Sequence, residues 1–311
     1  MANSIQLFKK YIDLLDEVYK QASKSSILDG DASLVQAGKN TNEIIIPKMS
    51  LDGLADYSRN SGYVKGDVTL TYETVKFNYD RGRKFVVDAM DDEETAGIAF
   101  GKLSSEFIRT KVVPEMDAFR FATYASLSGI GSATGTLATG ADVITALRAA
   151  ANEMDEAEVP AEQRVLFITP TLRGMIDDLD TSKSKEVLGK FSSVVEVPQS
   201  RFNTEITLLD GTTSGEEVGG FEATGNDINF MVIHTPAILQ YPKHTVNKII
   251  TPEANQDSDG WMFFYRAYGL ADAYENKVAG IYVHSKASAD EGAGDEGAGG
   301  DDAEGGEGAG A

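Results

Sequence analysis

The most constraining feature of this sequence is the order of patterns within residues 62–126: two strand-like runs separated by turn residues, and then one long helix with an apolar stripe. Apolar and polar residues alternate through residues 68–79, which places alternate side chains on one face of a sheet. The same alternation returns in residues 83–88, and Asp80, Arg81 and Gly82 interrupt it with turn chemistry. The pattern predicts a long β-hairpin that leads into a helix.

That helix is predicted to begin at Asp91 or Asp92, because aspartate caps a helix N-terminus well and the two glutamates that follow would occupy the favourable first turn. Apolar residues then recur at helical spacing for about 35 residues, on the order of 50 Å at 1.5 Å rise per residue. Pro114 lies inside the pattern and lacks a backbone donor. It predicts a kink or a short break near residues 110–113.

Two segments in this region carry a family resemblance. Residues 80–96 (DRGRKFVVDAMDDEETA) and 107–122 (FIRTKVVPEMDAFRFA) closely resemble major capsid proteins of tailed bacteriophages of the HK97 type, in the subgroup common among phages of Gram-positive hosts. Residues 142–167 and 249–284 also agree with that family. The resemblance spans most of residues 1–286, and its motifs are structural, so they speak for a fold and an assembly and not for a chemistry.

The resemblance implies an α+β fold of the HK97-like type, with an N-terminal arm, an extended β-hairpin loop, a long spine helix and an axial domain. It also implies a function: self-assembly through hexamers and pentamers into an icosahedral head shell in the virion, formed in the host cytoplasm. The shell would enclose double-stranded DNA without sequence-specific binding. The implied divisions are an arm at 1–45, an extended loop at 46–90, a spine helix at 91–128, an axial domain at 129–245, peripheral strands at 246–276, a return strand at 277–288 and a disordered acidic tail at 289–311.

In the family the extended loop lies over a neighbouring subunit, which implies a set of interface residues. Cations at the hairpin turn would pair with acids of the next subunit, and each exposed pair would contribute about 0–1 kcal/mol. Helix capping is the simpler explanation of the same acids. The implied interface residues are Phe8 and Tyr11 in the arm, Tyr72, Arg81, Arg83 and Lys84 in the hairpin, and Asp91, Asp92 and Glu94 at the start of the helix.

The resemblance also implies partners. Family members often carry an N-terminal scaffolding segment, whereas this sequence reaches its hairpin pattern by Gly62, so we expect a separate scaffolding protein. A portal protein and, in some members, a decoration protein would complete the head.

The remaining organisation follows from local patterns. Residues 4–22 place apolar side chains on one helical face and charged ones largely opposite, which predicts a docking helix. Residues 23–42 are rich in Ser, Gly, Asp and Asn and are predicted to form an extended arm. Residues 129–140 are predicted to be a Gly/Thr linker, followed by a helix at 141–156, a strand at 165–169, a short helix opened by Pro170, and long strands after residue 244.

Composition narrows the class of protein. The 311 residues include no cysteine, which excludes disulfides and thiolate chemistry, and no apolar run approaches the roughly 20 residues of a membrane-spanning helix. The net charge of −21 argues against a nucleic-acid reader. Residues 290–311 consist of eight acidic residues, nine glycines and five alanines, so we expect a solvated tail, or one that repels DNA or neighbouring particles.

The sequence offers no catalytic, cofactor or metal site. His234, His244 and His284 do not stand at metal-ligand spacing, and the glycines of residues 129–135 lack the order of a phosphate-binding loop. The carboxylates near Asp29 and Asp257 lack the bidentate glutamate of a calcium loop. Three alternatives to the capsid interpretation stay open: an encapsulin-like nanocompartment shell, a tail-tube or surface-layer protein, and, least supported, a hydrolase.

Overall fold

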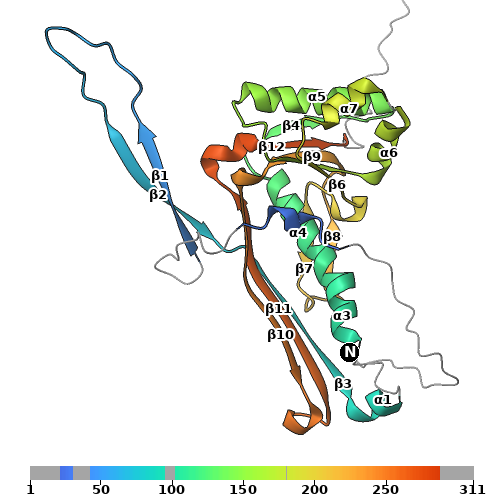
Figure 1. Cartoon of the computed structure of the whole chain (residues 1–311). Coiled ribbons are helices and arrows are strands. Elements are labelled where there is room, and N and C mark those ends of the chain that lie inside the picture. The colour runs from blue at the N-terminus through green and yellow to red at the C-terminus, as the bar shows by residue number, and fades with distance from the viewer. Residues whose placement is uncertain (1–21, 31–42, 95–101, 180, 288–311) are drawn as a thin grey trace, which may run out of the picture.

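The computed structural model describes residues 22–30, 43–94, 102–179 and 181–287. Three parts are visible in Figure 1: a sheet domain with helices above it, a long limb made of a helix and three strands, and a hairpin that leaves the body at an angle. The predicted helix at 4–22, with Phe8 and Tyr11, and the acidic tail lie outside the described residues.

The sheet domain is built on five strands. Its outer pairs, β12–β4 and β5–β6, are parallel, and β9 pairs antiparallel with both β12 and β5. Three helices cover one face of the sheet: α5 (Gly140–Glu156), α6 (Pro170–Leu179) and α7 (Ser182–Leu188). The strand order is β4 (Gly131–Thr134), β12 (Ile281–Ser285), β9 (Ile228–His234), β5 (Arg164–Ile168) and β6 (Ser193–Glu196).

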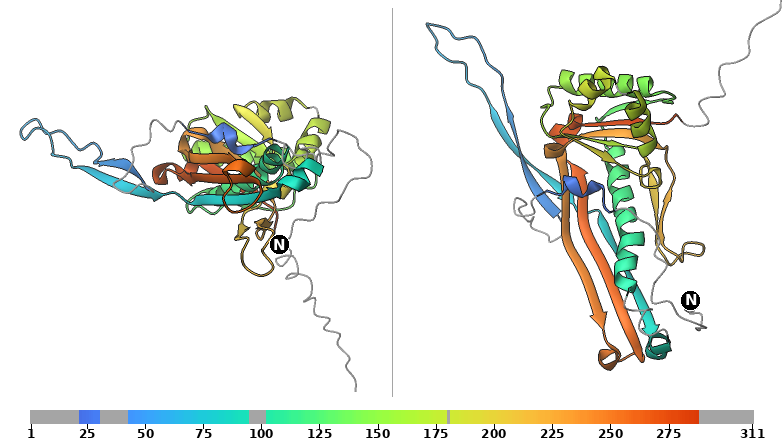
Figure 2. Two further views of the ribbon diagram at one scale, coloured as in Figure 1. Left: turned by 90° about the horizontal axis from the view of Figure 1, so that it is seen from below. Right: turned by 45° about the vertical axis from the view of Figure 1, so that its right-hand side comes forward.

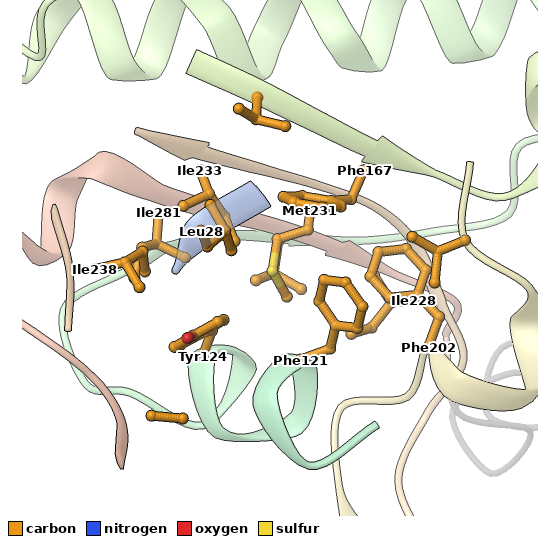
Figure 3. Packing of buried hydrophobic residues seen from close by; sticks show 14 of the residues in the cluster. Leu28, Phe121, Tyr124, Phe167, Phe202, Ile228, Met231, Ile233, Ile238 and Ile281 are labelled. Carbon is orange, nitrogen blue, oxygen red and sulfur yellow. The ribbon is translucent and has the colours of Figure 1, made fainter. Parts of the chain in front are cut away.

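The inner strands of this sheet are buried on both faces, and alternate residues of one strand serve two cores. Val165 and Phe167 of β5 pack with α4 (Val113–Ala125) below the sheet, and Leu166 and Ile168 pack with the helices above it. Continuous apolar strands are expected where both faces are covered. Figure 3 shows the lower core, where the Phe121 ring of α4 lies 5.1 Å from the Phe167 ring.

The limb packs a helix on a three-stranded antiparallel sheet in the order β10 (Ile238–Ile250), β11 (Gly260–Ala273), β3 (Tyr79–Asp88). Its helix runs through α3 (Leu103–Phe107), a π-helical segment at Ile108–Val112, and α4. Phe107 meets Phe85 and Phe263 of the sheet at ring distances of 4.8 and 6.2 Å. These contacts make the apolar stripe of the sequence the inner face of the helix.

The irregularity predicted near residues 110–113 is present as the π-helical segment, which ends at Val112, two residues before Pro114. A proline without its N–H leaves an earlier carbonyl without the usual partner, and a wider turn accommodates that loss. The predicted start of the long helix is wrong. The helix α1 (Ala89–Glu94) is separate from α3 in the element order, and the cap is Asp88, whose carboxylate accepts a hydrogen bond from the Met90 amide at 2.9 Å.

The hairpin is real, but its strands are not the predicted ones. Strand β2 (Val68–Lys76) pairs antiparallel with β1 (Glu43–Leu51), while β3 pairs with β11. The predicted turn at Asp80–Gly82 therefore lies inside β3. A β-carbon at Gly82 would stand 2.8 Å from the Tyr265 carbonyl oxygen, so this glycine permits a close approach between strands instead of a turn.

Two further segments correct the sequence analysis. The predicted linker at 129–140 contains β4, which joins the sheet beside β12. The described part of the predicted arm, residues 23–30, is anchored in the body, because Ser25–Leu28 forms a 3-10 turn in which Ser25 and Leu28 are buried. A second small hairpin, β7 (Ile206–Leu209) with β8 (Gly220–Ala223), runs alongside the limb helix (Figure 2).

Candidate subunit interface

The β1–β2 hairpin carries an uncovered apolar face. Register pairs Pro47 with Tyr72, Met49 with Leu70, and Leu51 with Val68, and these six side chains, here called the apolar face, point to one side. The opposite side carries Lys48, Ser50, Thr69, Thr71 and Glu73. Met49 is 62% exposed, Leu70 50% and Tyr72 66%, so the described residues leave this face open to solvent.

The base of the hairpin is held by the body. Ile44 and Val75 are buried against Leu239, Tyr241 and Leu270. On the polar side, Lys48 Nζ lies 3.1 Å from the Glu73 carboxylate and also contacts Glu275. The hairpin is therefore fixed in direction at one end and exposed at the other.

The loop of the hairpin is ordered by contacts of its own. Asp52 accepts a hydrogen bond from the Asp67 amide at 2.7 Å and closes the end of the strands. Tyr57 and Tyr63 pack ring to ring at 4.9 Å, and Leu54 is fully exposed. A two-stranded ribbon with such a face is marginally stable alone in water, so its burial against another surface is the physical expectation.

The three predicted interface cations lie in β3, within the limb and not at the tip of the hairpin. Arg81 Nε is 2.7 Å from Glu115 Oε1, and the same guanidinium donates to the carbonyls of Leu209 and Gly220. Arg83 donates to the Glu217 carbonyl, and Lys84 Nζ lies 5.5 Å above the Phe264 ring. Their expected projection from a hairpin turn is wrong, because their strand is paired within the chain; a contact with another subunit stays a prediction.

The predicted acidic interface residues lie in α1, away from the predicted cations. Asp91 and Asp92 occupy the first turn of α1, and Glu94 ends that helix. The Ala89 amide donates to the Asp259 carbonyl, so α1 sits at the foot of the limb beside the β10–β11 connection (Figure 1). The structure thus distributes those predicted residues that it describes over the hairpin (Tyr72), the middle of the limb and its foot, and does not bring these described residues together within one chain.

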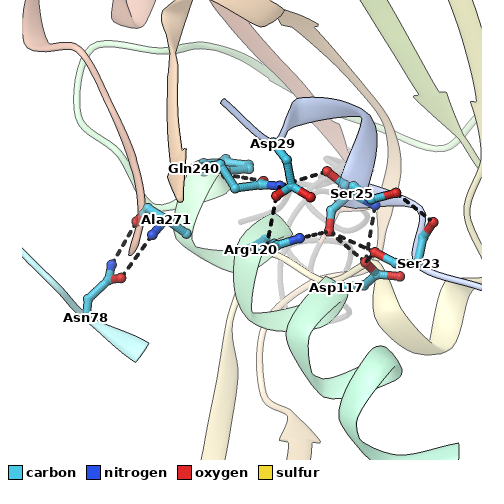
Figure 4. A network of polar contacts seen from close by, with 10 residues as sticks. Ser23, Ser25, Asp29, Asn78, Asp117, Arg120, Gln240 and Ala271 are labelled. Atoms are coloured by element: carbon cyan, nitrogen blue, oxygen red, sulfur yellow. Dashed lines mark hydrogen bonds and ion pairs between the residues drawn. The ribbon is translucent and has the colours of Figure 1, made fainter. Parts of the chain in front are cut away.

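Sequence reasoning missed a buried polar cluster, which is centred on the fully buried carboxylate of Asp117 (Figure 4). Asp117 accepts hydrogen bonds from both Ser23 and Ser25 hydroxyls at 2.7 and 2.6 Å, and from the Lys24 and Ser25 amides. Arg201 supplies the compensating charge at 3.0 Å. One signal was present in the sequence: an aspartate placed inside an apolar helical stripe.

The pKa shifts of these charged and ionisable side chains have structural causes, namely hydrogen bonding within the chain and burial. Hydrogen bonding to Arg266 lowers the pKa of Asp80, and burial lowers the pKa of His284, which lies within β12 and not at a sheet edge. Within the described ranges no three His, Cys, Asp or Glu side chains gather as metal ligands. None of the described helices combines the length and apolar character that crossing a membrane would take.

No protein-family model and no curated protein sequence matches the chain. Solved structures do match. A chain of Mycobacterium phage Che8 aligns with a TM-score of 0.61 at 15% identity, over 89% of this chain and 96% of that one. A capsid structure of the cyanophage P-SCSP1u aligns at 0.59 and 12%, over 91% and 93%, and the mature capsid of bacteriophage PhiM1 at 0.62 and 11%, over 90% and 91%.

At these identities the likeness establishes the fold. The chain has the α+β, HK97-like capsid fold that its sequence motifs suggested. Within that fold, the hairpin and the limb are the parts that extend furthest from the sheet domain (Figure 1).

Proposed function

We propose that this chain is a major capsid protein, which assembles with copies of itself into the icosahedral head shell that encloses the double-stranded DNA of a tailed phage. The observation that carries the proposal is the apolar face of the β1–β2 hairpin, held away from the body and open in the described chain. The capsid-type fold supports it. The role is structural and needs no catalytic group.

The energetics favour a permanent partner for this hairpin. Fully burying a Leu, Met or Val side chain contributes ~1.5–3 kcal/mol, and side chains that are already half covered would gain about half of that. The apolar face has four such side chains besides Pro47 and Tyr72, so its burial is favoured by several kcal/mol per subunit, on the order of what an assembly contact requires. A shell multiplies that gain over many identical contacts.

The geometry favours a closed assembly. A hairpin that reaches outward makes a head-to-tail contact, in which one surface of a copy meets a different surface of the next. Contacts of this type close into rings when the rotation between copies permits, and rings of five and six are the units of an icosahedral shell. We propose a separate scaffolding protein, a portal protein and, on some shells, a decoration protein as partners. We also propose the virion as the location, assembly in the host cytoplasm, and a phage of a Gram-positive host.

Electron microscopy of the purified full chain tests the proposal. We expect closed shells or isolated pentamers and hexamers. Tubes or flat sheets would favour a tail-tube or surface-layer protein, and shells that contain an enzyme cargo would favour a nanocompartment. Particles no larger than a single subunit at high protein concentration would contradict all of these assemblies.

A further inference from the structure

A long groove lies beside the limb helix and is separate from the β1–β2 hairpin. It has a volume of about 760 Å³ and is bounded by the helix, by β3 and by the β7–β8 hairpin. Figure 2 shows β7 and β8 running along the helix on this side. Its apolar lining includes Leu103, Phe107 and Pro114 from the helix, Phe85 from β3, and Val218 and Phe221 from the β7–β8 hairpin.

The helix presents a regular stripe to this groove. Leu103, Phe107, Thr110 and Pro114 recur at intervals of four, three and four residues, which places them on one face. An amphipathic helix commonly binds with its apolar side in an apolar groove of this kind. Val218 on the opposite wall is 78% exposed, so this wall also has apolar surface to cover.

The described chain begins at one end of this groove. Ser23, Lys24 and Ser25 are fastened to Asp117, and Arg201 donates to the Ala22 carbonyl at 3.3 Å. Ser200, the neighbour of Arg201, lines the groove together with Glu115. Residues before Ala22 therefore start where the groove starts.

The preceding sequence matches the groove in length and pattern. Residues 4–22 carry Ile5, Phe8, Ile12, Leu15 and Tyr19 on one helical face. As a helix, Ile5 to Tyr19 would span about 21 Å. The limb-helix residues that line the groove, from Lys102 to Glu115, cover a similar number of residues.

We propose that residues 4–22 of the same chain lie in this groove as an amphipathic helix, parallel to the limb helix, with Tyr19 at the Asp117 end and Ile5 at the Leu103 end. This register sets Asp13 level with Lys111, a lysine of the groove wall. It also sets Phe8 level with Glu106 and Phe107, opposite the β7–β8 hairpin.

The same chain is the favoured occupant because the tether is short. A segment attached at the end of its own site experiences an effective concentration in the millimolar range, which exceeds that of a second copy in dilute solution. This inference concerns a single subunit and goes beyond the proposed function, so it stands or falls independently of shell formation.

Cross-linking of the full chain tests the proposal, and the absence of natural cysteines makes engineered thiols unique. The test variant is Phe8→Cys with Val218→Cys. The control is Phe8→Cys with Glu162→Cys, an exposed site before β5. With a short bis-maleimide at low protein concentration, we expect a faster-migrating monomer from the test pair and none from the control, with native circular dichroism for both.

A second comparison asks whether residues 4–22 dock through the apolar side of their helix. Adding Leu15→Asp to the test pair should slow cross-linking by about tenfold or more, because a carboxylate is costly in an apolar groove. Adding Lys10→Asp, on the opposite face, should leave the rate unchanged. Dimer-sized products from the test pair would place a second copy in the groove and overturn the proposal. Three other results would also overturn the proposal. These are equal cross-linking rates for the test and control pairs, no cross-linked product from the test pair, and equal effects of the two aspartate substitutions on the rate.

Discussion

In the sheet domain every residue of β5 is buried, whereas burial in β1 and β2 falls away from the base of the hairpin towards its loop. Both regions alternate their side chains between two faces of a strand. The alternate residues of β5 meet α4 on one side and α5 on the other. In the hairpin, the apolar face meets solvent, whereas the opposite side is covered at its base by the contacts of Ile46 and Lys48 with the body and becomes exposed beyond them.

The difference shows where each region obtains its stabilisation. The sheet domain and the limb supply their own packing partners and their own charge compensation. The β1–β2 hairpin carries apolar side chains like those of a core, but no described part of the chain covers them. The covering surface therefore has to come from outside the described residues. Changes in the body should therefore affect unfolding, and changes on the apolar face should affect assembly.

The largest effect on folding is expected at Asp117. Replacing Asp117 by Ala leaves the buried guanidinium of Arg201 and four other donors without their acceptor, and breaking a buried pair in this way costs ~3–5 kcal/mol. Urea unfolding measures the loss. The matched control is Asp177→Ala, which removes an exposed i,i+4 pair with Arg173 and should cost no more than ~0.5 kcal/mol. Equal losses would show that the network does not anchor the chain.

The next effect compares two cations of the same strand, β3. Arg81→Ala removes a guanidinium that bonds to Glu115 and to two carbonyls, so we expect a loss of about 1.5–3 kcal/mol. Lys84→Ala removes only an exposed cation–ring contact, and its cost should stay within ~0.5–1 kcal/mol. Thermal unfolding separates the two variants. A Lys84 variant that unfolds as readily as the Arg81 variant would contradict the assignment of Arg81 to the body.

A smaller effect is expected from pH. Burial lowers the pKa of His284 below 6.5, and its Nδ1 accepts from the Asn229 amide, so the folded chain holds this ring neutral. The unfolded chain takes up the proton first. Stability is therefore full above about pH 6.5 and falls as pH drops below it, by at most ~1.4 kcal/mol per pH unit for one group.

Replacing His284 by Gln should make that fall shallower, and His234, whose pKa burial also lowers, accounts for part of the remainder. Asp272 acts in the opposite direction from about pH 3.8 upward, because burial raises its pKa. Urea unfolding between pH 5 and 8 gives the slopes. Parallel curves for the variant and the wild type would contradict a neutral His284 in the folded state.

Much of the fold was predictable, because its signals are local. The alternation of apolar and polar residues predicted the strands, and the helical spacing of apolar residues predicted the apolar stripe of α4. Pro114 predicted the position of the π-helical segment. Strand pairing was not local. Nothing within residues 68–88 indicates that β2 pairs with residues 43–51 and that β3 pairs with a strand about 180 residues later.

The candidate interface was predictable only in part. Tyr72 lies on the apolar face, and its contact with another subunit stays a prediction; Met49 and Leu70 were not identified, because their exposure depends on the strand pairing. The Asp80–Gly82 segment has the composition of a turn, yet its tertiary neighbours hold it in a strand. The Asp117 cluster joins serines and an arginine about 90 residues away on either side, a distance that no short motif encodes.

The most direct test of the central claim is sedimentation velocity on a hairpin variant, Met49→Ser with Leu70→Ser, which makes one paired rung of the apolar face polar. Both side chains are exposed, so unfolding should shift by no more than about 0.5 kcal/mol per site. The control is the adjacent rung on the polar face, Ser50→Ala with Thr69→Ala. The account predicts that wild type and control sediment as shells or capsomers while the folded variant sediments as single subunits. Shells from the variant in wild-type yield would contradict it.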